Sequence, residues 1–368
     1  MGYNNRMMSP TYHAARRFVG NHWLTVAFLL GFIVDSLTLT RVDQVFDNAI
    51  LFTYVVLAML SIFLLYAAIA ERFSERVNQF LKLRVPLLMQ YAFGGLLSGM
   101  LIFYGRSSSL SDSWLFILII IGVMVGNETI KDRAHRLVYN LVIFFVGLFS
   151  YVVLILPVLL GKMGPWIFLI SGALAIGVMY VFVRLLERVV PNFIHLQKRS
   201  IVFIIGMIYV GLNTLYFTNV IPPIPLSLKH LGVYHNVVKY ENGTYALTYE
   251  KPEWWEWYRS SDKAFHPVPG DNIYCYASVF APSRLAVKIF HRWEELDTET
   301  GKWREHGRFS YAIQGGRDDG YRGYTLISNF RSGTWRCTVE TERGQVIGRE
   351  VFEIQDGPPA ELVTKEEG

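Results

Sequence analysis

Charged residues are scarce in this chain of 368 residues, at 18%, against 52% hydrophobic residues. Soluble domains carry about 25% charge. The scarcity is uneven: residues 1–226 hold 17 Lys and Arg and 9 Asp and Glu, whereas residues 227–368 hold 18 and 21. A membrane part of net charge +8 is therefore followed by a polar part of net charge −3. Because the polar part is slightly acidic, a nucleic-acid binder is excluded despite the basic pI.

Cysteine is absent from the membrane part, and the polar part has only Cys275 and Cys337. Period-two alternation places Cys275 with Ala277 and Val279 and places Cys337 with Trp335 and Val339, so both sulfurs are expected to face a core. An oxidising compartment would allow a disulfide between them. Two separate buried thiols remain the alternative, because the sequence does not give their distance.

Long apolar runs dominate residues 1–221. A membrane-spanning helix needs about 20 mainly apolar residues, and seven stretches are candidates. The fourth is the weakest, because its apolar run is short. The stretches are Trp23–Thr40, Ala49–Ala70, Val85–Tyr104, Trp114–Gly126, Leu137–Leu160, Trp166–Leu186 and Ile201–Ile221.

Lys and Arg alternate between the connections of these stretches. Lys and Arg accumulate on the cytoplasmic side of a membrane. The N-terminal tail and the even-numbered connections hold Arg6, Arg16, Arg17, Arg72, Arg76, Lys82, Arg84, Lys131, Arg133, Arg136, Arg184, Arg188, Lys198 and Arg199. The odd-numbered connections hold only Arg41, Arg106 and Lys162. This pattern predicts seven spans, with the N-terminus inside and the C-terminal domain outside.

Ionisable residues are nearly absent from the depth of the predicted spans. Only Asp35 lies clearly within one, near its outer end. A proton-coupled transporter normally carries a deeper carboxylate or histidine. The membrane part is therefore interpreted as an anchor, and a small-solute transporter or membrane-embedded enzyme is the alternative.

The polar part shows the pattern of an all-β domain. Residues 222–230 begin with a proline-rich segment that predicts a short stiff linker. About eight short strands at intervals of 8–15 residues predict a β-sandwich over 231–356. Residues 357–368 are predicted to form a disordered tail. The expected fold is thus a seven-helix membrane bundle (1–221) followed by this β-sandwich.

Motifs for catalysis, cofactors and metals are missing. The histidines of the polar part, His235, His266, His291 and His306, lack a metal-ligand spacing such as HExxH. There is no nucleophile elbow, phosphate loop or dinucleotide fingerprint. The sequence therefore predicts no catalytic residue, metal or cofactor, and it favours a protein that is not an enzyme.

One segment of the polar part suggests a ligand site. Arg317 and Arg322 lie among four glycines, and a guanidinium binds carboxylates and phosphates through two parallel hydrogen bonds. Tyr321 and Tyr324 would add hydroxyl donors. The aromatic run Trp254, Trp255 and Trp257 is a candidate neighbouring wall. Internal salt bridges are the alternative for the arginines, and core packing is the alternative for the tryptophans.

A set of motifs in the polar part resembles a bacterial domain of unknown function. The motifs are Phe290-His291-Arg292-Trp293, Gly315-Gly316-Arg317, Gly320-Tyr321-Arg322-Gly323-Tyr324-Thr325, Gly333-Thr334-Trp335-Arg336, Gly344, Ile347-Gly348-Arg349 and Phe352. In that family the domain ends envelope proteins, often after a multi-spanning region. The resemblance implies a bacterial inner-membrane protein with a periplasmic C-terminal domain. The resemblance carries no activity of its own. The anchored outer domain is interpreted as a binding module in envelope recognition or assembly, with the lipid bilayer and an envelope glycan, an anionic lipid or a periplasmic protein as its partners.

Overall fold

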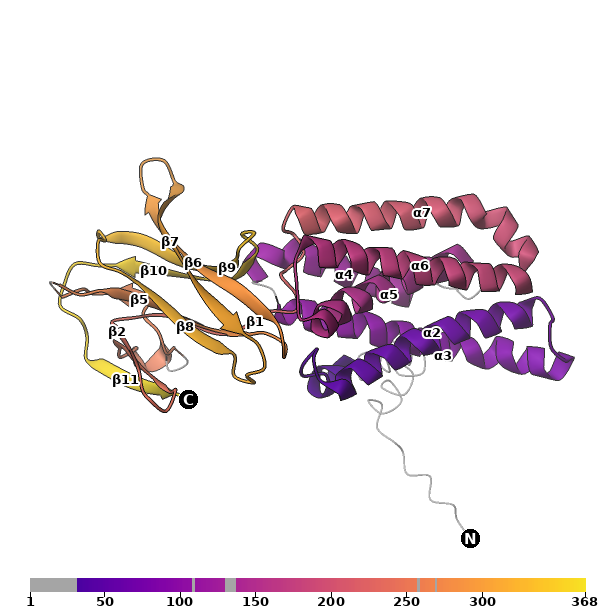
Figure 1. The fold of residues 1–368 in the computed structure, drawn as a ribbon, viewed down its shortest axis with the longest axis horizontal. Coiled ribbons are helices and arrows are strands. Elements are labelled where there is room, and N and C mark those ends of the chain that lie inside the picture. The colour runs from indigo at the N-terminus through magenta and orange to yellow at the C-terminus, as the bar shows by residue number, and fades with distance from the viewer. Residues whose placement is uncertain (1–31, 108–109, 130–136, 257–258, 269) are drawn as a thin grey trace, which may run out of the picture. The chain divides into compact units, whose positions relative to one another are not determined.

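The computed structural model describes residues 32–107, 110–129, 137–256, 259–268 and 270–368. A helical N-terminal part is followed by a β-rich C-terminal part (Figure 1). The helices that follow the short helical stretch 32–38 are α2 (Val45–Ile69), α3 (Glu75–Arg106), α4 (Leu110–Thr129), α5 (Leu137–Leu160), α6 (Pro165–Val189) and α7 (Pro191–Phe217).

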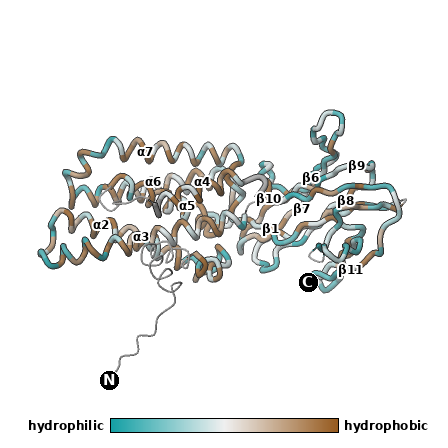
Figure 2. The backbone as a smooth tube through the Cα atoms, turned by 180° about the vertical axis from the view of Figure 1, so that it is seen from behind, coloured by the Kyte–Doolittle hydropathy of each residue, from teal (hydrophilic) through white to brown (hydrophobic). Residues whose placement is uncertain are grey.

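Five of these helices, α2, α3, α5, α6 and α7, are long and apolar enough to cross a membrane. The predominance of hydrophobic residues along them is visible in Figure 2. Helix α4 contains a shorter apolar stretch, Trp114–Gly126. Half of the first predicted span, together with Lys131, Arg133 and Arg136, lies outside the described residues. Seven spans therefore remain a prediction.

Asp35 is buried in the helical part, with only 7% of its surface exposed. Its carboxylate accepts hydrogen bonds from the hydroxyl of Tyr54, at 3.1 Å, and from the hydroxyl of Ser98. A buried carboxylate is costly unless polar groups pair with it. These two hydroxyls pair the Asp35 carboxylate inside the helical part.

The β-rich part contains two larger layers of strands. One sheet has the order β1-β5-β8, from β1 (Ser227–Tyr234), β5 (Ile273–Phe280) and β8 (Tyr321–Ile327). The other has the order β4-β10-β9-β6-β7, from β4 (Ala264–Phe265), β6 (Ala286–Asp297), β7 (Lys302–Gln314), β9 (Gly333–Thr341) and β10 (Val346–Ile354). The pairings are antiparallel except for β10 with β4.

A shared hydrophobic core joins the two layers in a sandwich-like arrangement. Cys275 from β5 packs in one cluster with Trp293, Trp335 and Cys337 from β6 and β9. All four side chains are fully buried. The inward direction predicted for both cysteines is confirmed, since strand alternation places them on the core face.

A third, smaller sheet has the order β11-β3-β2, from β2 (Asn236–Lys239), β3 (Tyr245–Glu250) and β11 (Leu362–Glu367). It encloses a second core rich in tyrosine, with Tyr234, Tyr245 and Tyr276 at its centre. The sheet β1-β5-β8 is therefore covered on part of its second face as well.

Two boundaries differ from the prediction. The tail predicted to be disordered forms β11, which pairs antiparallel with β3 from Leu362↔Glu250 to Glu367↔Tyr245. The predicted linker also ends earlier, since β1 already begins at Ser227. In both cases pairing with a strand distant in sequence supplies the hydrogen bonds that local composition does not indicate.

Candidate functional site

The predicted ligand segment connects β7 to β8 and then enters β8. Its glycines serve packing: a Cβ on Gly315 would lie 1.7 Å from the carbonyl oxygen of Pro282, and one on Gly323 would lie 2.4 Å from the ring of Tyr311. At Gly320 the backbone has φ of +86°, and a Cβ would meet Ser278. The chain itself fills the space beside these three glycines, so their small size does not open that space to a ligand.

Arg322 extends from β8 over the turn that precedes β3. Only 11% of its side chain is exposed, and its contacts are long: 3.9 Å to the exposed carboxylate of Asp319 and 3.5 Å to the carbonyl oxygen of Gly243. Within the described part of the chain, its buried Nε has no hydrogen-bond partner. A buried guanidinium with such weak partners retains most of its capacity to bind an anion.

Tyr245 lies beside this guanidinium and donates a hydrogen bond of 3.4 Å to the backbone carbonyl of Arg322. Burial raises the pKa of Tyr245, the hydroxyls of Tyr321 and Tyr324 raise it further, and the positive charges of Arg317 and Arg322 lower it. Tyr245 thus contacts Arg322 and Tyr324, and it interacts electrostatically with Arg317 and Tyr321. No sequence pattern indicates a role for Tyr245, which lies 77 positions before Arg322.

Arg317 and Tyr324 are the accessible members of this arginine–tyrosine cluster, which we define as Arg317, Tyr321, Arg322, Tyr324 and Tyr245. Arg317 is exposed, and its guanidinium lies 5.3 Å from the ring centre of Tyr321. Tyr324 is 38% exposed and packs at an angle against Tyr245. The cluster thus combines two cations with accessible aromatic and hydroxyl groups.

The tryptophans of the predicted wall follow the other end of β3. Trp254 and Trp255 belong to a short 3-10 helix (Trp254–Glu256), and their rings meet edge to face at 5.5 Å. They are 81% and 56% exposed, so they are not core residues. Arg322 contacts Gly243 before β3 begins, whereas Trp254 and Trp255 follow the end of this strand. Trp257 lies outside the described residues.

Other arginines of the β domain are held by ion pairs. Arg336 forms two short hydrogen bonds, of 2.6 and 2.8 Å, with the carboxylate of Glu294. Arg308 binds Glu340 at 2.8 Å, and Arg292 lies 3.3 Å from the same residue. Nearby positive charges hold the pKa of Glu294 below its usual value although burial opposes this. These ion pairs link β6, β7 and β9 on the outer face of the sheet.

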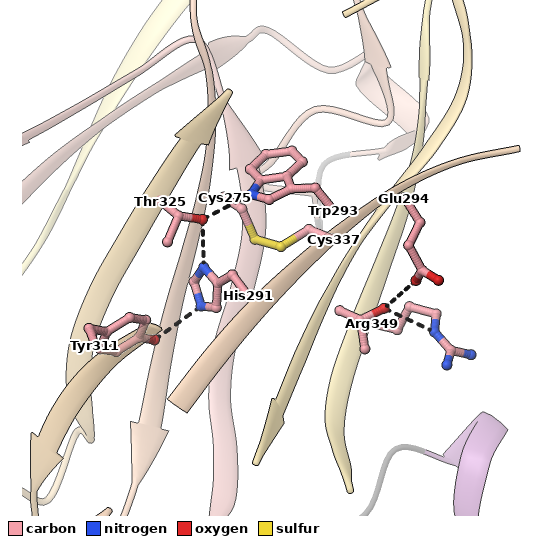
Figure 3. Close-up of a disulfide and its surroundings, with 9 residues drawn as sticks. Cys275, His291, Trp293, Glu294, Tyr311, Thr325, Cys337 and Arg349 are labelled. Atoms are coloured by element: carbon pink, nitrogen blue, oxygen red, sulfur yellow. Dashed lines mark hydrogen bonds between the residues drawn. A yellow bond between two sulfur atoms is a disulfide. The ribbon is translucent and has the colours of Figure 1, made fainter. Parts of the chain in front are cut away.

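The disulfide region is a packed polar network inside the sandwich (Figure 3). The structure bonds Cys275 to Cys337, with their Cα atoms 6.5 Å apart. His291 contacts the hydroxyls of Thr325, at 3.1 Å, and Tyr311, at 3.0 Å. Although Cys275, His291 and Cys337 lie close enough to hold a metal ion, sulfurs bonded to each other are not thiolate ligands. His291 is therefore a buried, hydrogen-bonded imidazole.

Residues 286–354 match the model of a family described as "Protein of unknown function (DUF2914)". The match covers β6 to β10 and includes His291, Cys337 and the predicted ligand segment. It agrees with the resemblance to an uncharacterised family noted from the motifs. No curated protein matches the chain.

Two solved structures show weak similarity. One is a β-glucosidase from Listeria innocua in complex with gluconolactone, 13% identical, covering 32% of this chain and 16% of that chain at a TM-score of 0.21. The other is the alkylpurine DNA glycosylase AlkC of Pseudomonas fluorescens bound to DNA, 10% identical, covering 86% and 99% at a TM-score of 0.24. The chain thus spans less than a fifth of the glucosidase. Similarity at this level carries no functional argument.

Proposed function

We propose that this chain is a bacterial inner-membrane protein that presents its β domain in the periplasm as a binding module for anionic envelope ligands. Seven helices would anchor it, with the N-terminus in the cytoplasm. The anionic group would be a phosphate or carboxylate of a lipid head group or glycan. This role suits an accessory factor in envelope recognition or assembly, without chemistry of its own.

The observation that carries this proposal is the weak pairing of Arg322. The comparison with Arg336 is direct, because both guanidiniums are largely buried, at 11% and 14% side-chain exposure. Arg336 has a carboxylate oxygen at 2.6 Å, whereas the partners of Arg322 among the described residues are an exposed carboxylate at 3.9 Å and a carbonyl oxygen at 3.5 Å. Burial of a charge without close partners is unfavourable, and an incoming anion would supply them.

Two features support an inner-membrane protein with a periplasmic β domain: the five apolar helices and the disulfide between Cys275 and Cys337. The helices fit the membrane part by length and composition. A disulfide between Cys275 and Cys337 forms and persists in oxidising compartments such as the periplasm. The alternation of Lys and Arg in the sequence orients the chain with this domain outside.

Binding of two soluble probes tests the proposal. Glycerol 1-phosphate represents a lipid head group, and a carboxylated oligosaccharide represents a glycan; each is titrated against the full chain in detergent. We expect Arg322→Gln to weaken binding of at least one probe by about tenfold or more, the effect of losing a charge-assisted hydrogen bond. Arg304→Gln is the control, since Arg304 is 76% exposed and pairs with Asp297.

The thermal unfolding temperature separates binding from structure. The account expects Arg322→Gln to unfold within a few degrees of the unmodified chain. If neither probe binds the unmodified chain, or if Arg322→Gln lowers the unfolding temperature strongly while binding persists, Arg322 is a structural residue and the proposed site is wrong.

A further inference from the structure

A second polar cluster of the β domain is formed by His235, Glu250 and Asp262. His235 lies between β1 and β2, Glu250 is the last residue of β3, and Asp262 lies in the segment before β4. Their side chains are 4%, 9% and 0% exposed. Three separate segments therefore bring one imidazole and two carboxylates into the same buried place.

The distances within this cluster are those of a metal site. The Nε2 atom of His235 lies 3.2 Å from a carboxylate oxygen of Glu250 and 3.9 Å from Oδ2 of Asp262. One donor atom from each residue falls within 4.8 Å of the other two. Around a tetrahedral Zn²⁺, with bonds of about 2.0–2.1 Å, ligand atoms are separated by roughly 3.3 Å. The separation between His235 and Glu250 already matches this value, whereas Asp262 would have to move closer to Nε2 of His235 to join the coordination.

Asp262 has an unused oxygen directed into the cluster. Its Oδ1 accepts a hydrogen bond of 2.7 Å from the backbone N–H of Glu250, which orients the carboxylate. Its Oδ2 is buried and has no hydrogen-bond partner within the described part of the chain. An unsatisfied buried oxygen costs free energy, and a bound water or ion is one of its common explanations. Here the oxygen faces Nε2 of His235.

Neighbouring groups hold the three side chains in place. The ring of His235 stacks on Phe265 at 4.0 Å, and its Nδ1 lies 3.7 Å from the carboxylate of Asp271. Histidines that bind metals commonly direct their second nitrogen at a carboxylate. Glu250 accepts hydrogen bonds from the backbone of His266, at 2.8 Å, and of Ala360, at 3.0 Å. The imidazole of His266 also contacts Glu250, at 2.9 Å.

We propose that His235, Glu250 and Asp262 bind a divalent transition-metal ion, with Zn²⁺ as the preferred ion. One imidazole nitrogen and two carboxylate oxygens form a mixed ligand set, whereas Ca²⁺ and Mg²⁺ prefer oxygen alone. Asp271 and His266 act as positioning residues. The ion would tie β3 to the segments around β2 and β4, which makes the site a structural centre independent of the arginine–tyrosine cluster.

Metal counting on the full chain tests the site. The chain is purified in detergent through a tag without histidine, stripped with a chelator, and equilibrated with Zn²⁺. We expect one Zn²⁺ per chain and at least tenfold weaker binding in Asp262→Asn and in His235→Gln. Asp271→Asn should weaken binding by about 10–100-fold, as loss of an outer partner does. His306→Gln is the control, because His306 is an exposed histidine of β7.

Thermal unfolding with and without Zn²⁺ distinguishes a variant that has lost the metal site from one that does not fold. A ligand that binds only the folded state raises its unfolding temperature. The unmodified chain and His306→Gln should show this rise, whereas Asp262→Asn, which keeps the side-chain shape, should not. The proposal is overturned if the unmodified chain holds no Zn²⁺, or if Asp262→Asn binds the ion as tightly and gains the same stability from it.

Discussion

His291 is the clearest case in which burial sets the chemistry of one residue. Its side chain is inside the sandwich, and burial lowers the pKa of its imidazole to about 3 from an ordinary value of 6.5. In the unfolded chain His291 takes up a proton near pH 6.5, whereas in the folded chain its imidazole stays neutral down to about pH 3. The stability that this neutral histidine contributes is therefore complete above pH 6.5 and is lost as the pH falls toward 3.

Replacement of His291 by Gln should reduce this pH dependence, since Gln can still contact the hydroxyls of Thr325 and Tyr311 but does not titrate. Between pH 6.5 and 4.5 the unfolding free energy of the unmodified chain should fall by about 2 kcal/mol more than that of His291→Gln. Denaturant unfolding in detergent, followed by tryptophan fluorescence at several pH values, measures the difference. Parallel curves for the two proteins would show that His291 does not titrate on unfolding.

The pairing of Cys275 with Cys337 gives a second prediction for single residues. A disulfide that closes a loop of 62 residues stabilises a fold by up to about 4 kcal/mol, by restricting the unfolded chain. Non-reducing peptide mass spectrometry of the chain isolated from membranes should find the two cysteines linked. Two free thiols in material prepared with a thiol-blocking reagent and without reductant would contradict the pairing.

Alternation along strands explains which residues could be predicted from the sequence. Cys275, Trp293 and Cys337 each occupy an inward position of a regular strand, and the structure buries all three. Tyr245 and Asp262 could not be predicted in the same way. Tyr245 contacts Arg322, and Asp262 lies near His235, a residue of another segment. The local sequence around Tyr245 and Asp262 does not indicate these contacts.

Strand β11 illustrates the same limit at the level of elements. Its sequence, Leu-Val-Thr-Lys-Glu-Glu, follows two prolines and has the charge of a solvated tail. The strand forms because β3 offers a free edge to six consecutive residues. Most strands from β2 to β10 could be predicted because their own alternation is strong, whereas the pairing partner determines β11.

Deletion of residues 362–368 tests the contribution of this strand. The backbone groups of β3 that face β11 should lose their partners, whereas those bonded to β2 should keep them. Hydrogen exchange followed by mass spectrometry should show faster exchange confined to β3 and a lower unfolding temperature. The amides of β2 serve as the internal control. Unchanged exchange in β3 after the deletion would indicate that β11 does not pair in solution.

At the level of the whole molecule, the proposed function combines a membrane anchor with an outward-facing binding domain. Five helices satisfy the length and composition of a span. The orientation rests on the Lys and Arg pattern of the connections, much of which lies outside the described residues. The position of the β domain relative to the membrane is therefore the claim on which the proposed function depends most.

Reporter fusions test that claim most directly. In bacterial cells, an enzyme that is active only in the periplasm is fused after Gln355 in one strain and at Arg133 in another, with immunoblots to show equal expression. The account predicts activity for the fusion after Gln355, because seven spans place the β domain outside, and no activity for the fusion at Arg133. An inactive reporter after Gln355, or an active one at Arg133, would contradict the seven-span topology and the periplasmic binding module with it.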